Sequence, residues 1–243
     1  MRHMTTTIAL IGGHGKIAQL ATTRLVELGN RVRSVIRSES QTETVEARGA
    51  EAYLADIEDP DLDLAALLDG VDLVIWAAGA GGGDPQRTMA VDRDAAIRMM
   101  QACARHGIRD FMMVSYWGAR TDHGVDPENA FWHYAEAKAA ADAKLRASEL
   151  DWVIVAPTLL TLETGNGAIS AEITVPDATG LDPAVRLDSV GEPIAREDVA
   201  HLVAELVEPM VQGRIHHVTV SAAGGRTPIA EVVDQTVQTV RNA

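Results

Sequence analysis

The sequence has only one cysteine and three lysines in 243 residues. The single cysteine, Cys103, excludes an internal disulfide and a metal cluster built from cysteines. It falls in the apolar helical run IRMMQACA, so we expect it to be buried. The lysines are Lys16, Lys138 and Lys144, and arginine carries the remaining basic charge. Because lysine is so scarce, the surroundings of each one are informative.

Long hydrophobic runs are also missing. No stretch approaches the about 20 apolar residues that a membrane helix needs. The N-terminal MRHMTTTIALIGG lacks the hydrophobic region and cleavage site of a signal peptide, so we expect a cytoplasmic protein. The net charge of −14 argues against a nucleic-acid partner, which usually requires a basic face. A small-molecule substrate is the expected partner, and the sequence leaves both a monomer and a homodimer open.

Short β-branched runs alternate with helical segments. Strands are predicted at residues 7–12, 31–37, 51–56, 71–79, 110–116, 151–157 and 216–221. Helices are predicted at residues 16–29, 41–48, 86–106, 128–149, 196–208 and 227–241, and a loop region rich in Gly, Pro, Thr and Asp at 162–195. This alternation predicts an α/β protein with a Rossmann-type doubly wound parallel sheet. We expect one domain, residues 1–243, whose small C-terminal portion, 157–243, forms the substrate-binding side.

A glycine-rich turn joins the first predicted strand to the first helix. It reads IGGHGKIA and contains Gly12, Gly13, His14, Gly15, Lys16 and Ile17. Glycines at such a turn let the backbone approach a pyrophosphate, which then sits on the free N–H groups of the helix. A simple glycine turn would give the same letters, but the position between the first strand and the first helix favours dinucleotide binding.

The second predicted strand ends in Arg37 rather than in an acidic residue. A cation at this point suits a 2′-phosphate, so we expect NADP(H) to be preferred over NAD(H). The alternative is a solvated charge at a strand end. Asp56 and Ile57, after the third strand, are expected to meet the adenine. Ala77, Ala78 and Gly79 close the fourth strand and either leave space for the ribose and phosphates or simply pack in the sheet.

Three residues from the fifth predicted strand and the helix after it can form a reaction centre. Ser115 stands at the carboxyl edge of the fifth strand, where ligands bind in doubly wound sheets. Tyr134 and Lys138 are four residues apart and share one helical face. An ammonium group beside a tyrosine favours the phenolate, so we expect Lys138 to lower the pKa of Tyr134. Such a tyrosine can exchange a proton while a cofactor exchanges hydride.

Aromatic residues are few, yet they gather around this pair. Tyr116, Trp117, Trp132 and His133 are expected to line a substrate pocket, completed by segments 117–130 and 160–195. For Phe131 and Trp132 the alternative is hydrophobic contact that holds the helix to the sheet. Pro157, at the end of the sixth strand, is expected to border the cofactor.

These motifs resemble the short-chain dehydrogenase/reductase superfamily over nearly the whole chain. The closest likeness is to its atypical NAD(P)H-binding branch, which includes NmrA-like proteins and biliverdin/flavin reductases. The likeness rests on IGGHGKIA, VIRS, VIWAAG, VDRDAAIRMMQACARHGIRDFMMVS, YAEAKAAADAKLRASELDWVIVAP and IAREDVAHLV. The resemblance implies that Ser115, Tyr134 and Lys138 are the catalytic set. One departure is Ala156 before Pro157, where many relatives have arginine.

Three functions remain open at this point. The first is an NADPH-dependent oxidoreductase that reduces a small carbonyl, quinone or flavin-like acceptor, with Tyr134 as proton donor. The second is a regulator of the NmrA-like type that binds NADP(H) without turnover, because the Tyr-Lys pair is not used by every member of this branch. The third is a sugar-nucleotide or isomerase-type enzyme that uses a bound cofactor.

Overall fold

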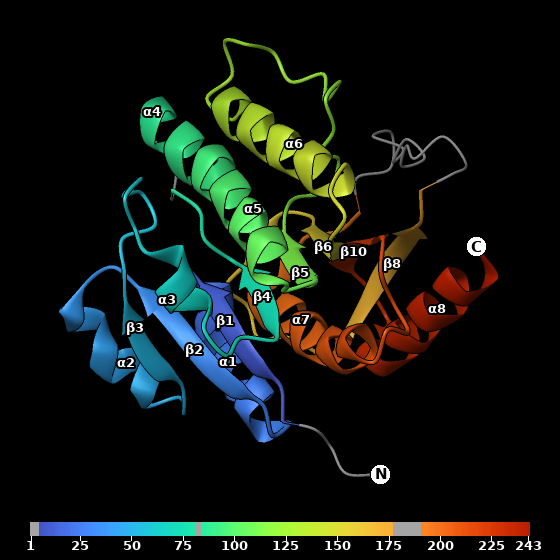
Figure 1. The fold of residues 1–243 in the computed structure, drawn as a ribbon. Coiled ribbons are helices and arrows are strands. Elements are labelled where there is room, and N and C mark those ends of the chain that lie inside the picture. The colour runs from blue at the N-terminus through green and yellow to red at the C-terminus, as the bar shows by residue number, and fades with distance from the viewer. Residues whose placement is uncertain (1–4, 81–83, 177–190) are drawn as a thin grey trace.

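Parallel strands form the centre of the molecule (Figure 1). The computed structural model describes residues 5–80, 84–176 and 191–243. The parallel strands are β1 (Thr7–Ile11), β2 (Arg31–Ile36), β3 (Glu51–Leu54), β4 (Leu73–Trp76), β5 (Asp110–Val114), β6 (Asp151–Pro157) and β10 (Val218–Gly224). Within the described residues, the nine-stranded sheet has the order β11-β8-β10-β6-β5-β4-β1-β2-β3. The predicted doubly wound sheet is therefore confirmed.

Two antiparallel strands extend the sheet at its C-terminal edge. They are β8 (Ala168–Thr174), which pairs with β10, and β11 (Thr227–Pro228), which pairs with β8. A separate pair joins β7 (Leu160–Thr161) to β9 (Ile194–Ala195). The prediction of a loop over 162–195 is wrong for β8, because its turn-rich flanks concealed a strand whose partner lies more than forty residues away. Residues 177–190 of that segment lie outside the described part of the chain.

Helices cover both faces of the sheet (Figure 1). One face carries α1 (Lys16–Glu27), α7 (Arg196–Val211) and α8 (Ile229–Asn242). The other carries α3 (Leu64–Leu68), α4 (Pro85–Thr88), the π-helical segment η2 (Met89–Ala95), α5 (Ala96–His106) and α6 (Trp132–Arg146), while η1 (Glu39–Gln41) and α2 (Thr42–Glu46) connect β2 to β3. Successive side chains of β1 point into two different hydrophobic cores, one on each face of the sheet. Ile8 and Leu10 face α1 and α7, whereas Ala9 and Ile11 face α3 and α5. This period of two explains why the buried strands are apolar throughout.

The helix predicted over 86–106 exists, and it contains an irregularity. α4, η2 and α5 follow one another without a break from Pro85 to His106, and α6 packs alongside them (Figure 1). Asp84 caps the start with its carboxylate, Pro85 occupies the first turn, and Gly107 ends the helix in a left-handed conformation. The π-helical segment in the middle carries the buried Asp92, a residue of the site described below.

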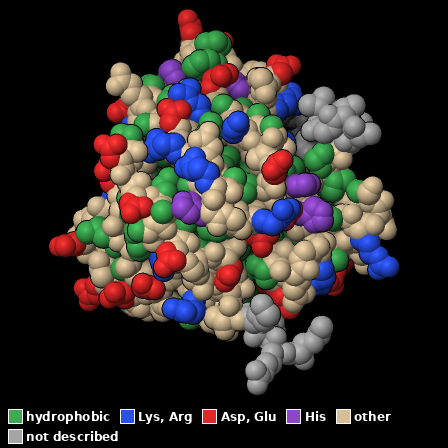
Figure 2. Space-filling model, in the orientation of Figure 1, with side chains coloured by type: hydrophobic (Ala, Val, Ile, Leu, Met, Phe, Trp, Pro, Cys, Tyr) green, Lys and Arg blue, Asp and Glu red, His purple; other side chains and the backbone are tan. Residues whose placement is uncertain are grey.

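None of the helices in the part of the chain that the structure describes combines the length and hydrophobicity needed to cross a lipid bilayer. On the face shown in Figure 2, acidic and basic side chains are interspersed.

A cluster of carboxylates at the amino end of β5 generates a first prediction. Burial, followed by the charge of Asp151, raises the pKa of Asp110 to about 6, against about 3.9 in an unfolded chain. Between these two pKa values, the folded protein holds a proton on Asp110 that the unfolded chain has lost. The stability that comes from this bound proton is lost as the pH rises through about 6.

We therefore expect Asp110→Asn to stabilise the protein at pH 7.5. Because Asp110 is partly exposed, we expect a gain of about 1 kcal/mol and a rise of about 2–4 °C in Tm. At pH 4.5 the gain should largely vanish, because the wild-type carboxyl is then protonated in the fold. Thermal denaturation at both pH values measures this, and a lower Tm for the variant at pH 7.5 would contradict the assignment.

Candidate functional site

The glycine turn after β1 packs so closely that side chains are excluded. Gly12 has a positive φ of 80°, and a Cβ there would lie 2.5 Å from the Cα of Ala78. A Cβ on Gly13 would collide with the hydroxyl of Ser34 in β2. The amide of Gly13 donates to the carbonyl of Val35 at 2.9 Å, which fixes the turn against the neighbouring strand. The turn therefore forms a cradle of bare backbone between the ends of β2 and β4.

The start of α1 is open to an anion. Gly15 is its N-cap and has no side chain to accept from the first amides, and His14, Gly15 and Lys16 are exposed. Lys16 and Ile17 begin the helix, so their N–H groups precede the intrahelical bonds and meet the positive end of the helix dipole. A bare cradle beside an uncapped helix start fits the pyrophosphate of a dinucleotide. The residues of this turn that the sequence predicts to bind the cofactor, Gly12 to Ile17, thus lie together around the cradle.

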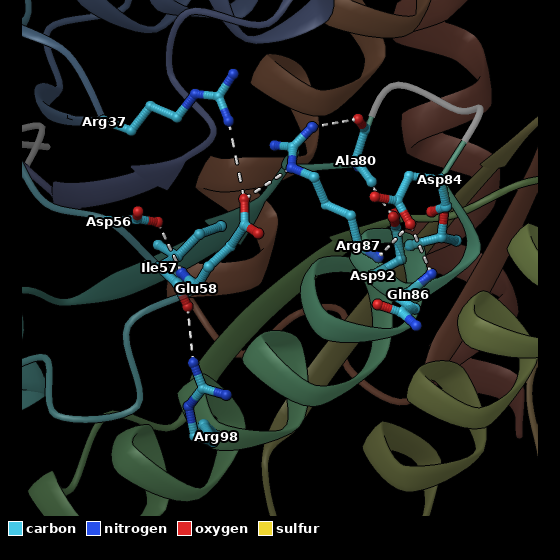
Figure 3. A network of polar contacts seen from close by, with 11 residues as sticks. Arg37, Asp56, Ile57, Glu58, Ala80, Asp84, Gln86, Arg87, Asp92 and Arg98 are labelled. Atoms are coloured by element: carbon cyan, nitrogen blue, oxygen red, sulfur yellow. Dashed lines mark hydrogen bonds and ion pairs between the residues drawn. The ribbon is translucent and has the colours of Figure 1, made fainter.

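The residues expected at the adenosine end follow β2, β3 and β4. Arg37 is exposed at the end of β2, with an ion pair of 3.8 Å to Glu58. Asp56 accepts from the amide of Glu58 at 2.9 Å, and the carbonyl of Ile57 accepts from Arg98 at 2.7 Å. Both are therefore held in a fixed turn (Figure 3).

Small residues close β4 on the other side of this region. The amide of Ala77 donates to the carbonyl of Ile11 at 3.0 Å, which continues the pairing with β1. Ala78 contacts the glycine turn, and Gly79 lies against the buried Asp92, whose Oδ1 would be 3.2 Å from a Cβ at that position. Packing alone therefore accounts for small residues here, and a role toward the cofactor stays a prediction.

Lys138 of α6 is buried, with 1% of its surface exposed. Its ammonium group donates to the carbonyl of Val114 at 2.8 Å and contacts the sulfur of Met113 at 3.1 Å. Burial holds the pKa of Lys138 below its usual range, and the carboxylates of Asp142 and Asp92 offset only part of this effect. The lysine thus ties α6 to the end of β5 and is compensated by two buried acids.

Ser115 and Asp142 join this buried cluster. The hydroxyl of Ser115 donates to Oδ2 of Asp142 at 2.5 Å, and its amide donates to the carbonyl of Val155 in β6. Asp142 follows Lys138 by one helical turn, as Lys138 follows Tyr134, so the three share one face of α6. The proton of Ser115 is therefore engaged within the protein, although its oxygen can still accept.

Tyr134 behaves differently from the expectation. Burial raises the pKa of Tyr134 above its usual range, and the carboxylates of Asp92 and Asp142 act in the same direction. The prediction that Lys138 lowers this pKa is wrong for this structure, because the ammonium group faces β5 and two acids offset its charge. Tyr134 is therefore a neutral phenol at physiological pH, and its hydroxyl has no hydrogen-bond partner among the described residues.

Asp92 is a member of the cluster that sequence reasoning missed. It lies in the π-helical segment η2, is 1% exposed, and accepts from the amide of Ala80 at 3.0 Å. Burial raises the pKa of Asp92, while Lys138 lowers it. Asp92 thus connects the loop after β4 to the lysine of α6. Helical turns of the π type often mark functional sites, but the local sequence VDRDAA gives no sign of one.

Aromatic rings pack around Tyr134. Tyr116 and Phe131 each lie within 5.6 Å of the Tyr134 ring, measured between centroids, and they contact each other edge to face. The Tyr116 hydroxyl and the Trp117 indole N–H are buried without a hydrogen-bond partner among the described residues, so both can serve a ligand.

The other predicted pocket residues lie beside this group. Trp132 and His133 contact each other edge to face at 4.9 Å and are partly buried at the start of α6. Pro157 is buried at the end of β6, and its carbonyl accepts from the amide of Trp117 at 2.8 Å. The rings of Tyr116 and Phe131 thus form the wall nearest to Tyr134.

A groove of about 300 Å³ lies beside the first turn of α1. It is lined by Lys16, Gln19, Leu20, Arg48, Thr161, Leu162, Glu163, Thr164, Arg196 and Glu197. Arg196 donates to the carbonyls of Leu160 and Thr161, so it shapes the groove by holding β7. Among the residues that the structure describes, no three His, Cys, Asp or Glu side chains are grouped as a metal site requires.

Comparison with known proteins supports a dinucleotide-binding site. A Bacillus subtilis protein named as an uncharacterized sugar epimerase, YhfK, is 36% identical over 234 residues, which cover 93% of this chain and 98% of that protein. A solved structure from Bacillus halodurans, named as a candidate NAD-dependent epimerase/dehydratase, superimposes with a TM-score of 0.82 at 31% identity. The match covers 95% of this chain and 99% of that one.

A more distant structure shares the fold alone. The anaerobilin reductase ChuY of Escherichia coli O157:H7 matches with a TM-score of 0.67 at 20% identity, over 90% of this chain and 97% of that one.

The family model described as NAD(P)H-binding matches residues 12–209, which include the glycine turn, the buried lysine cluster and the start of α7. The chain therefore belongs to the NAD(P)H-binding family of atypical short-chain dehydrogenases/reductases.

Proposed function

We propose that the protein is an NADPH-dependent reductase of a small carbonyl, quinone or flavin-like acceptor, with Tyr134 as the proton donor. The observation that carries this proposal is the state of Tyr134. A phenol whose pKa is raised keeps its proton at neutral pH, and its hydroxyl is not engaged by the described residues. Such a neutral phenol carries the proton that a reduced substrate oxygen needs, so it can act as a general acid.

Each group of the cluster has a distinct role in this proposal. A cofactor held by the glycine turn and the start of α1 would supply the hydride when bound. Tyr134 gives its proton to the acceptor oxygen and recovers one from solvent, which its raised pKa favours. Lys138 holds α6 on β5 and so fixes the position of Tyr134 one turn away. Ser115, whose proton is engaged by Asp142, offers an acceptor oxygen to the product hydroxyl.

The glycine turn and α1 hold the pyrophosphate in this proposal, and Arg37 binds the 2′-phosphate of NADPH. Arg37 is exposed, so it can turn toward a phosphate without a large loss of packing. A guanidinium group suits this partner because it donates two parallel hydrogen bonds to phosphate oxygens.

A second candidate is a regulator that binds NADP(H) without turnover. It is favoured by one observation, namely that the Lys138 ammonium and the Ser115 proton are both occupied by protein groups. A third candidate, a sugar epimerase, rests on the name of the relative in Bacillus subtilis.

Replacement of Tyr134 by phenylalanine tests the first proposal. With NADPH and a panel of quinones, flavins and aldehydes, Tyr134→Phe should reduce kcat by about 100-fold or more, which is typical of a lost general acid. The dissociation constant for NADPH, measured by fluorescence titration, should stay within about twofold because the ring remains in place. Tyr53→Phe is the matched control, since Tyr53 lies in β3 and contacts Arg33. Full activity of Tyr134→Phe would contradict the proton-donor role, and NADPH binding without turnover of any acceptor would favour the regulator.

Replacement of Arg37 by alanine tests the cofactor preference. Loss of a charge-assisted contact at an exposed site should weaken NADPH binding by about tenfold and leave NADH binding nearly unchanged. Arg31→Ala is the control, because Arg31 stands at the opposite end of β2 and is exposed. Equal affinities of the wild type for NADPH and NADH would contradict the preference.

A further inference from the structure

Glu58 stands between two arginines at the adenosine end of the site. Its Oε1 accepts from Nε of Arg87 at 2.9 Å and lies 3.8 Å from Nη1 of Arg37. Figure 3 shows both guanidinium groups directed at this one carboxylate. Sequence reasoning named Arg37 alone, because Arg87 comes from α4 and meets Glu58 only through the fold.

The carboxylate is held firmly on the Arg87 side. Arg87 uses a second nitrogen, Nη1, to donate to the carbonyl of Ala80 at 2.7 Å, so it spans from the loop after β3 to the loop after β4. The backbone around Glu58 is fixed as well, by the carboxylate of Asp56 and by Arg98. Arg37 makes the longer and more exposed of the two pairs, so it is the partner that a competing anion releases first.

A carboxylate beside Arg37 affects the two cofactors in opposite ways. A 2′-phosphate carries nearly two negative charges at neutral pH, and a freely rotating Glu58 would repel it and compete for Arg37. A ribose 2′-OH, in contrast, can donate a hydrogen bond to a free carboxylate, as acidic residues accept it in NAD-binding sites. The position of the Glu58 carboxylate therefore bears directly on the choice between NADPH and NADH.

We propose that Arg87 is a positioning residue for cofactor selectivity, which anchors the Glu58 carboxylate and compensates its charge, so that Arg37 can leave its longer ion pair with Glu58 and bind the 2′-phosphate. This inference rests on the proposed function, since it assumes that Arg37 meets the 2′ position. Arg87 acts through Glu58 and makes no contact with the phosphate itself. The choice between NADPH and NADH then depends on the Glu58 carboxylate and on two arginines, of which Arg37 binds the phosphate and Arg87 positions Glu58.

A double-mutant cycle tests the proposal by binding alone. Dissociation constants for NADPH and NADH are measured by calorimetry for the wild type, Glu58→Gln, Arg87→Met and the double variant. Both sites are partly exposed, and circular dichroism confirms folding of each variant. The readout is the ratio of the NADH to the NADPH dissociation constant, because any loosening of the Ala80 loop affects the shared adenine and cancels from the ratio.

The expected pattern is specific to an indirect role. Glu58→Gln should raise the ratio about fivefold, because a charge that repels the phosphate is removed. Arg87→Met should lower the ratio about fivefold in the wild-type background, yet change it less than twofold when residue 58 is glutamine. Equal losses in both backgrounds would overturn the proposal and make Arg87 a direct phosphate ligand.

The same titrations separate this inference from the function beneath it. If the wild type binds both dinucleotides but Glu58→Gln leaves the ratio of the two dissociation constants unchanged, the inference alone is overturned. A wild type that binds neither dinucleotide overturns the proposed function and the inference together.

Discussion

The buried ammonium group of Lys138 is the interaction on which the site depends. A lysine that is 1% exposed would destabilise the fold by several kcal/mol without partners, and it has them in the carbonyl of Val114 and the acids Asp92 and Asp142. These partners come from β5, from α6 itself and from the π-helical segment η2. The partners of the Lys138 charge therefore fix the relative position of a strand and two helices. The loop after β4 is held to the same cluster by the hydrogen bond from the amide of Ala80 to Asp92.

This arrangement also determines the state of Tyr134. With the lysine directed at β5 and offset by carboxylates, its charge does not reach the phenol, and burial dominates. The phenol stays neutral, as the proposed role of proton donor requires. The i, i+4 pair that suggested an ionised tyrosine from the sequence thus holds a neutral tyrosine in the fold. Cofactor selectivity is a separate matter, which we propose depends on Arg37 after β2, Glu58 after β3 and Arg87 in α4.

Local patterns in the sequence were sufficient for the elements whose cause is local. The glycine turn, the parallel strands, the helix over 86–106 and the shared face of Tyr134 and Lys138 follow from periodicity and from the tight backbone at Gly12 and Gly13. The features that were missed depend on distant partners. Strand β8 is defined by its pairing with β10, Asp92 is buried where η2 packs against α6, and Glu58 meets Arg87 across two loops. The direction of the Lys138 ammonium group depends on the carbonyl of Val114 in β5 and on Asp92 in η2, which spacing along α6 alone does not reveal.

The central claim, that Tyr134 is a neutral phenol held in place by a charge-balanced lysine, is tested most directly by a spectroscopic titration. Phenolate absorbance is followed against pH in the wild type and in Tyr134→Phe, and the difference isolates one of three tyrosines. The account predicts that Tyr134 gives no phenolate signal below about pH 10, the ordinary range of tyrosine. A signal that rises near neutral pH in the wild type and is lost in Tyr134→Phe would contradict it.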